Sequence, residues 1–275
     1  MKPTVLMCRP DFYGVQYEIN PWMDTAREVD HAEAVRQWER LRQLIEGAGA
    51  EVGLVPPVKG LPDLVFTANA ALIYRRRAVL SCFRHSQRQG EEAHFRVALE
   101  AQGFGVCEPP GSRSFEGAGD ALFCGDALFA GYMSRSDAAG HQRIAELLGI
   151  GVLPLELVDP YYYHLDTCFC PLVPGVAAYF PRAFDDYGRR VLRENVPVLI
   201  EVAEGEAREF ACNAVVIGKR VITNEGCPDF HRSLGGLGFD PVATPLHEFV
   251  KAGGSAKCLT LRLDGEDAAG WRSSG

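Results

Sequence analysis

A cysteine, a histidine and two carboxylates occupy matching places in the chain, each just ahead of an apolar segment. Cys258 follows the small residues 253–256 (GGSA), Glu116 lies in FEGAGDAL, and His164 and Asp166 open HLDTCFCPL. A cysteine thiolate is a nucleophile, and a nearby histidine can protonate a leaving amine and then deprotonate water. Two carboxylates in a closed cleft would bind a planar cation such as a guanidinium group. These residue types predict covalent attack by Cys258 on a guanidino carbon.

Each of these residues has a simpler explanation when it is taken alone. A cysteine after a glycine-rich loop is more often an inert buried residue, and a lone histidine is more often a satisfied core or surface residue. Asn69 and Asn213 could be turn residues, and Asp120 could accept hydrogen bonds from backbone amides. Lys257 would favour the Cys258 thiolate, but on a strand its side chain would point away from the face that Cys258 presents. What favours a shared site is the common position of these residues in a repeat.

The elements that must position these residues recur about every 45–50 residues, a period typical of repeat architectures. Apolar periodicity predicts five helix-then-strand units: 31–47 with 51–56, 91–102 with 104–109, 138–148 with 152–157, 183–195 with 197–202, and 228–237 with 241–245. Apolar runs around Gly-containing turns predict hairpins at 70–83, 121–132, 168–180 and 213–223. A fifth hairpin would require the segment 257–263 to pair with the N-terminal strand 4–8.

This repeat predicts one α/β domain, residues 1–264, built as five hairpin–helix–strand modules around a pseudo-fivefold axis. Pairing the two ends of the chain closes the ring and leaves no free sheet edge. An open α/β sheet with two halves would explain the alternation of helix and strand but not the hairpin in every period. We expect the small, polar residues 265–275 to form a flexible tail.

Composition excludes several classes of function. The formal net charge of −8 makes a nucleic acid or an anionic membrane surface a poor partner, since phosphate binding needs clustered Lys and Arg. No apolar run approaches the roughly 20 residues of a membrane helix, and no secretory signal opens the chain. Nine irregularly spaced cysteines indicate a reduced, cytoplasmic protein. Since no glycine-rich phosphate loop follows a strand, we expect no cofactor, and we expect no metal.

The motifs PDLVFTANA, FEGAGDAL, HLDTCFCPL, ACNAVVIGKRVI and GGSAKCLTLRL, in this order, resemble the guanidino-group-modifying enzymes: arginine deiminases, dimethylarginine dimethylaminohydrolases and amidinotransferases. The resemblance covers residues 5–263 and implies the five-bladed α/β propeller of the pentein fold. It also implies a small guanidino or ureido amino acid as the substrate. The roles that it implies are Cys258 as nucleophile, His164 as acid and base, Glu116 and Asp166 as guanidinium ligands, Arg84 and Arg135 as ligands of the α-carboxylate, and Asn20, Asp63, Phe66, Asn69 and Gly119 as further substrate-binding residues.

Asn69 departs from the pattern of the deiminases and dimethylargininases, which carry an aspartate at this place. The segment FTAN, together with YEINPWM at 17–23, is most similar to the arginine dihydrolase branch, which the resemblance implies converts arginine into ornithine, ammonia and carbon dioxide. An aspartate would clamp the cationic guanidinium but repel or misplace a neutral ureido product. An asparagine offers both a donor and an acceptor, so it could hold citrulline for a second attack.

Three alternatives stay open at this point. The enzyme could break a single bond, as a dimethylargininase, an arginine deiminase or a citrulline hydrolase. It could be a non-catalytic binding propeller, which the joint presence of Cys258, His164, Glu116 and Asp166 disfavours. It could also hold a metal through His164, Asp166, Cys168 and Cys170, although Cys-x-Cys spacing is unlike the usual structural zinc pairs. The sequence leaves open whether the chain forms a homo-oligomer.

Overall fold

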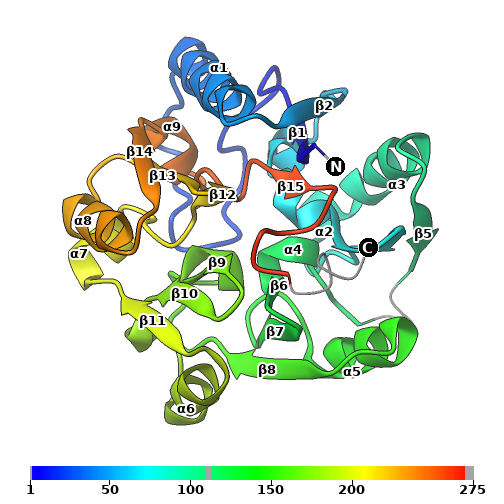
Figure 1. Ribbon diagram of the computed structural model, residues 1–275. Helices are drawn as coiled ribbons and strands as arrows, with labels where there is room; N and C mark the ends of the chain where they lie inside the picture. The colour runs from blue at the N-terminus through cyan, green and yellow to red at the C-terminus, as the bar shows by residue number, and fades with distance from the viewer. Residues whose placement is uncertain (1, 109–112, 270–275) are drawn as a thin grey trace.

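The computed structural model describes residues 2–108 and 113–269, and their strands form five three-stranded sheets arranged in a ring (Figure 1). In every sheet the middle strand pairs antiparallel with one neighbour and parallel with the strand that follows a helix. The predicted five-bladed α/β propeller is therefore confirmed. The sheets are β15 (Leu261–Arg262), β1 (Thr4–Cys8) and β2 (Glu51–Val55); β3 (Ala71–Tyr74), β4 (Arg77–Leu80) and β5 (Gly105–Cys107); β6 (Ala121–Cys124), β7 (Ala127–Tyr132) and β8 (Val152–Glu156); β9 (Phe169–Val173), β10 (Val176–Tyr179) and β11 (Val198–Glu201); and β12 (Val215–Ile217), β13 (Arg220–Asn224) and β14 (Asp240–Thr244).

The longer helices lie on the outside of the ring (Figure 1), and each connects the two parallel strands of its sheet. Their apolar stripes face inward: in the first, Ala34, Trp38, Leu41 and Ile45 are all buried, and Asp30 caps its start by accepting the Glu33 N–H. These helices are α1 (His31–Gly47), α3 (Glu91–Ala101), α5 (Ala138–Leu148), α6 (Asp186–Asn195) and α8 (Pro228–Gly236). Short helices are α2 (Ser86–Gln89), α4 (Gly117–Asp120), α7 (Glu204–Arg208) and α9 (His247–Val250), and the 3-10 turns are η1 (Pro62–Val65), η2 (Thr67–Ala70), η3 (Leu165–Thr167) and η4 (Pro181–Ala183).

The two ends of the chain close the ring as predicted. Val5 pairs antiparallel with Arg262, and Leu6 with Leu261. The strand is shorter than expected, because Cys258 lies in a turn before β15 rather than on a strand. The fourth helix also begins later than predicted, at Asp186, because residues 181–183 form a separate 3-10 turn.

Residues 265–269, which we expected to belong to a flexible tail, pack against the ring, while residues 270–275 lie outside the described part of the chain. Ala268 and Ala269 are buried, and Ala269 bridges to Gly125 in the hairpin between β6 and β7. Asp267 accepts hydrogen bonds from Arg262 and from the backbone of Gly218. The composition of this segment did not predict its packing, because the packing depends on contacts with distant residues rather than on the segment's own apolar content.

Short turns stand immediately ahead of the first strand of four sheets, and they carry the predicted site residues toward one another. These turns are η2 before β3, α4 before β6, η3 before β9, and the turn at residues 255–259 before β15. A backbone hydrogen bond from Ala68 to the Cys258 carbonyl joins the first and last of them. The repeat therefore places chemically active side chains from different modules around one axis.

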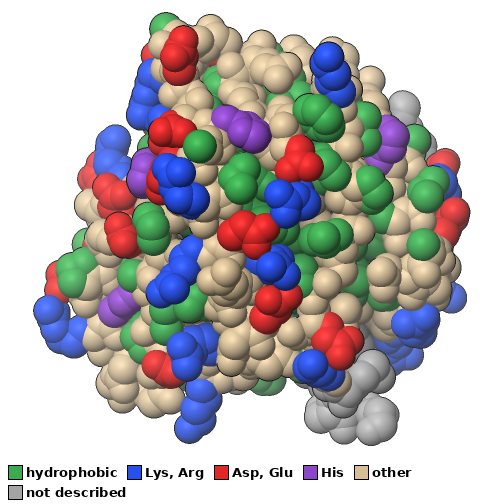
Figure 2. Space-filling model, turned by 90° about the horizontal axis from the view of Figure 1, so that it is seen from above, with side chains coloured by type: hydrophobic (Ala, Val, Ile, Leu, Met, Phe, Trp, Pro, Cys, Tyr) green, Lys and Arg blue, Asp and Glu red, His purple; other side chains and the backbone are tan. Residues whose placement is uncertain are grey.

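Charges on the face drawn in Figure 2 are mixed, with acidic and basic side chains interspersed as neighbours. Charged side chains also pair along single helices, such as the half-buried Arg42 with Glu39 and Glu46 on α1. In the described residues, no helix is both long enough and apolar enough to cross a membrane.

Candidate active site

A pocket with about 260 Å³ of empty space lies where the turns meet. The loop between β1 and α1 contributes Ile19, Asn20 and Met23, and Asn20 is tied down by a 3.1 Å hydrogen bond to the Ala252 carbonyl. The remaining lining residues are Asp63, Phe66, Asn69, Arg88, Arg135, Tyr163, His164, Ala252, Gly254 and Cys258.

Cys258 is buried at this pocket and contacts two polar side chains. Its Sγ lies 3.5 Å from Asp166 Oδ2 and 3.1 Å from Asn213 Nδ2. Burial, followed by the Asp166 charge, raises the pKa of Cys258 well above its usual value. Burial also raises the pKa of Asp166 to about 7, with Lys257 opposing the rise. The resting cysteine is thus a thiol, and thiolate formation needs help from the site or the substrate.

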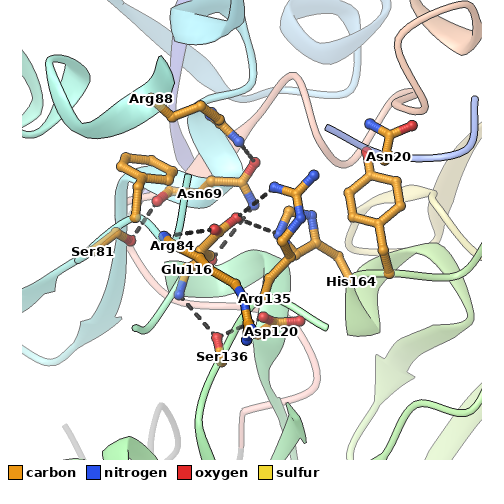
Figure 3. Close-up of polar contacts among 12 residues, drawn as sticks. Asn20, Asn69, Ser81, Arg84, Arg88, Glu116, Asp120, Arg135, Ser136 and His164 are labelled. Atoms are coloured by element: carbon orange, nitrogen blue, oxygen red, sulfur yellow. Dashed lines mark hydrogen bonds and ion pairs between the residues drawn. The ribbon is translucent and has the colours of Figure 1, made fainter. Parts of the chain in front are cut away.

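His164 and Arg135 converge on the carboxylate of Glu116, as Figure 3 shows. The distances to Glu116 Oε2 are 2.7 Å from His164 Nε2 and 3.2 Å from Arg135 Nη1. Burial would raise the pKa of Glu116, but Arg135 and His164 hold it well below its usual range. Burial lowers the pKa of His164 to about 4. The ionised Glu116 can only accept, so the neutral His164 carries its proton on Nε2.

Asn69 is held at the pocket by Arg88. Arg88 Nη1 donates to Asn69 Oδ1 at 2.9 Å, which turns the Nδ2 group of the amide toward the Glu116 carbonyl at 3.5 Å. Arg88 is itself fixed by Glu91, with 2.9 and 2.8 Å bonds to the two carboxylate oxygens. One oxygen of Asp63, Oδ1, is buried without a hydrogen-bond partner, and Asp63 lines the pocket. The pocket therefore combines anionic and cationic groups, as an amino acid with a basic side chain requires.

The structure brings most of the predicted residues to the pocket wall, but four of them do not line it. Glu116 and Asp166 lie behind His164 and Cys258, in direct contact with them, so their expected role as guanidinium ligands stays a prediction. Gly119 packs against Asn69, where it leaves no room for a side chain. Arg84 is exposed, and only its backbone N–H reaches Glu116, at 3.3 Å.

The role of Arg84 as a ligand of the substrate carboxylate therefore stays a prediction, and of these two neighbouring arginines it is Arg88 that lines the pocket. Arg88 lies within α2, and its side chain is buried. Sequence reasoning missed Arg88, although its spacing of three residues from Glu91 is a signal for an ion pair on one helical face. It also missed Tyr163 and Met23, for which the sequence carries no comparable signal.

The glycines before Cys258 allow protein groups to approach closely. Gly253 has a φ of +79°, and an added Cβ would lie 2.9 Å from both Asn20 Oδ1 and Tyr163 Oη. A Cβ on Gly254 would lie 2.4 Å from the Phe66 ring. The loop is thus packed directly against the pocket residues.

The four residues considered as metal ligands turn to different partners. His164 contacts Glu116, and Asp166 contacts Cys258. Cys168 Sγ lies near the carbonyls of His164 and Leu165, and Cys170 Sγ lies near the carbonyl of Pro171. Within residues 2–108 and 113–269, no group of three or more His, Cys, Asp or Glu side chains is arranged to hold a metal ion.

The fold and this site define a class of guanidino-modifying hydrolases, and comparison with known proteins agrees. A family model described as eukaryotic N,N-dimethylarginine dimethylhydrolase matches residues 16–263. The chain is also 40% identical to a dimethylarginine dimethylaminohydrolase of Mycobacterium tuberculosis, over 94% of this chain and 84% of that protein. The chain belongs to this family.

Two cyanobacterial relatives are more similar still. The chain is 49% identical to the bifunctional arginine dihydrolase/ornithine cyclodeaminase AgrE of Nostoc and 48% identical to ArgZ of Synechocystis, over 94% of this chain in both cases. It spans only 37% of the length of each of these relatives.

Solved structures give the same result. The N-terminal domain of ArgZ, as a cysteine-to-serine mutant bound to substrate, matches with a TM-score of 0.92 and 47% identity, over 95% of this chain and 98% of that one. A dimethylarginine dimethylaminohydrolase at 20% identity, with a TM-score of 0.80 over 95% of this chain and all of that one, shares the fold.

Proposed function

We propose that this chain is an arginine dihydrolase, a cysteine hydrolase that converts arginine into ornithine, two ammonia molecules and carbon dioxide. The observation that carries the proposal is that Cys258, His164 and Asn69 line one pocket. It is supported by the 47–49% identity to AgrE and ArgZ, which are named as arginine dihydrolases. The activity resides in one catalytic domain, against which residues 265–269 pack.

Substrate binding uses the two kinds of charge in the pocket. Arg135 lines the pocket with Asn20 and donates to the Ile19 carbonyl, and it pairs with the substrate α-carboxylate. Asp63, with its unpartnered oxygen, and the ionised Glu116 attract the guanidinium group toward Cys258. A cation held there also lowers the free energy of the thiolate, since opposite charges favour ionisation.

The first half of the reaction breaks one C–N bond. The Cys258 proton passes to His164, and the thiolate attacks the guanidino carbon to form an S–C bond. The imidazolium of His164 then protonates the leaving nitrogen, which departs as ammonia and leaves a covalent thiouronium. Water deprotonated by His164 attacks the same carbon, breaks the S–C bond and yields citrulline.

The second half repeats these steps on the ureido carbon. Attack by Cys258 releases the second ammonia, and water frees a carbamate that decomposes into ornithine and carbon dioxide. The uptake of two waters balances the two ammonia molecules and the carbon dioxide. Asn69 distinguishes this outcome from single-step hydrolysis, because its neutral amide tolerates the uncharged ureido group, whereas an aspartate would not.

The test is to incubate the protein with arginine and to quantify ornithine, citrulline and ammonia. We expect about two ammonia molecules per arginine, with ornithine as the amino acid product, and we expect Asn69→Asp to stop at citrulline. Cys258→Ser, which should be inactive with arginine, is the control for the nucleophile. Undiminished ornithine release by Asn69→Asp would contradict the role of Asn69, and turnover by Cys258→Ser would contradict the mechanism.

A second candidate is dimethylarginine dimethylaminohydrolase activity. It is supported by the matching family model and by the relative from Mycobacterium tuberculosis, 84% of whose length the chain covers. Release of dimethylamine and citrulline from dimethylarginine, without turnover of arginine, would favour it.

We place the protein in the cytoplasm. All nine cysteines are free, and seven of them are buried. Reduced thiols in this number are typical of a reducing compartment.

A further inference from the structure

Asn213 contacts Cys258, a neighbour that only the folded structure reveals. It belongs to the turn before β12, and its backbone N–H donates to the Phe210 carbonyl at 2.9 Å. Phe210 has a φ of +61°, a left-handed backbone conformation that residues other than glycine seldom adopt, so this turn has a defined backbone geometry. The side chain of Asn213 is completely buried beside Cys258.

Three hydrogen bonds fix the Asn213 amide, and one of them decides which way it faces. The backbone N–H of Cys258 can only donate, so the amide atom 3.1 Å away must be the oxygen, Oδ1. Nδ2 is then directed at the Asp166 carbonyl, at 3.0 Å, and at Cys258 Sγ, at 3.1 Å. The two hydrogens of the NH₂ group are both used, one for each acceptor, so the sulfur receives a hydrogen bond.

We propose that Asn213 is a further catalytic residue of this site, whose side-chain amide stabilises the Cys258 thiolate by donating a hydrogen bond to Sγ. The inference rests on the proposed function, because it takes Cys258 as the nucleophile. A hydrogen bond to the charged form of a group favours that form. It is stronger to the thiolate than to the thiol, as are hydrogen bonds to ionised groups in general.

The other charged groups around the sulfur make this donor necessary. Asp166, 3.5 Å from Sγ, opposes a second negative charge, as does burial. The ammonium group of Lys257 is engaged elsewhere, 2.9 Å from Glu266 Oε1. The backbone of Ser255 and the Asn213 amide both act in favour of the thiolate. The remaining titratable groups that line the pocket near Cys258 are His164, Tyr163, Asp63, Arg88 and Arg135.

The bond also joins the nucleophile to its neighbours. Asn213 connects the backbone of Cys258, its sulfur and the carbonyl of Asp166, while its own carbonyl accepts from the Lys257 N–H at 3.1 Å. A change at Asn213 could therefore act on position as well as on charge, and the experiment must separate these two effects.

The first measurement is the rate at which iodoacetamide alkylates Cys258, followed by mass spectrometry of the peptide that contains it. In Asn213→Ala we expect the thiol pKa to rise by about one unit, which lowers the thiolate fraction about tenfold. Because a more basic thiolate is intrinsically more reactive, the net alkylation rate at neutral pH should fall only about threefold. Arginine turnover should fall as well, by about tenfold or more.

Asn224→Ala is the matched control. Asn224 is a buried asparagine of the same module that also bonds two backbone groups, the Glu209 carbonyl and the Leu246 N–H, but it does not contact the sulfur. We expect a comparable loss of thermal stability with an unchanged alkylation rate of Cys258. If Asn213→Ala alkylates at the normal rate, or if Asn224→Ala slows alkylation equally, the proposal is overturned.

Asn213→Asp separates charge from position. It keeps the oxygen that accepts the Cys258 N–H, but its second oxygen can donate to Sγ only while it is protonated. We therefore expect its arginine turnover to decline as pH rises through the pKa of the introduced carboxyl group. Normal turnover with a normal pH profile would assign Asn213 a purely positional role and overturn the proposal. Turnover by Cys258→Ser would instead overturn the proposed function itself.

Discussion

Gly119 and Asn69 are packed so closely that a Cβ atom added to Gly119 would lie 2.1 Å from Asn69 Nδ2. The same atom would stand 3.5 Å from His164 Cγ. Because Arg88 holds Asn69 Oδ1 at 2.9 Å, the amide cannot swing away without breaking that bond. The glycine in α4 therefore determines where the Asn69 amide and the His164 ring can lie.

We predict that Gly119→Ala displaces the Asn69 amide and lowers arginine turnover by at least about tenfold. Overpacking a buried position typically costs about 1–3 kcal/mol of stability, so the protein should still fold. Steady-state kinetics and thermal unfolding together check this. Gly235→Ala is the control, since a Cβ there meets nothing within 4 Å. Unaltered ornithine release by Gly119→Ala would show that the close contact does not matter.

A second prediction contrasts two arginines four residues apart. Arg88→Gln removes the partner of Asn69 and leaves Glu91 buried without its ion pair, so we expect loss of turnover and about 3–5 kcal/mol of destabilisation. Arg84→Gln should change the KM for arginine by no more than about twofold, because the Arg84 side chain is exposed. Kinetics and denaturant unfolding of both variants provide the measurement.

Arg88→Lys helps to separate the two effects of the first variant. It keeps a positive charge beside Glu91 but cannot bond both Glu91 and Asn69 in the fork geometry of an arginine. We expect the fall in arginine turnover to be the main effect and the loss in the free energy of unfolding to be the minor one. A large increase in KM for Arg84→Gln would return the carboxylate-binding role to Arg84.

The architecture could be predicted from the sequence because one pattern recurs in five modules, and five consistent copies outweigh an error at any single boundary. The positions of Cys258 and His164 at one pocket followed from their common phase in that repeat. Arg88, and the contact of the Asn213 amide with Cys258, could not be placed in the same way. Whether such a side chain points inward depends on the dihedral angles of one short turn, which the periodicity of the flanking helices and strands does not determine.

The stability of the protein should depend on pH through His141. This histidine is buried in α5, both of its ring nitrogens lack a hydrogen-bond partner, and burial lowers its pKa to about 4. An unfolded histidine has a pKa of about 6.5, so between these values the unfolded state binds a proton that the folded state does not. Stability is fully present above about 6.5 and falls as pH drops toward 4, by about 3 kcal/mol in all.

His141→Leu should remove this contribution. We expect its free energy of unfolding to decline less steeply than that of the unmodified protein over the same pH range. His94→Leu is a control, since His94 is an exposed histidine of α3. Parallel pH profiles for His141→Leu and the unmodified protein would contradict the assignment.

A further prediction concerns the segment after Asp264, which forms two ion pairs with the last module. The buried Lys257 pairs with the half-buried Glu266 at 2.9 Å, and Asp267 bonds Arg262 in β15. Deleting residues 265–275 leaves the buried Lys257 unpaired, which should cost about 3–5 kcal/mol and lower the unfolding midpoint on the order of 10 °C. Deleting only 270–275 keeps both pairs and serves as the control. Equal midpoints for the two truncations would mean that the pairs contribute nothing.

Glu266→Gln tests whether the pair of Lys257 and Glu266 also affects catalysis. Glu266 raises the pKa of Asp166, so removing its charge should bring that pKa below its present value of about 7. A carboxyl group with a lower pKa stays ionised to lower pH. Since the family resemblance predicts that the ionised Asp166 binds the guanidinium group, the acid limb of kcat/KM should move to lower pH in Glu266→Gln. Lys257→Met, which removes the cation that lowers the same pKa, should move it in the opposite direction; shifts of the same sign in both variants would show that the pair acts on folding alone.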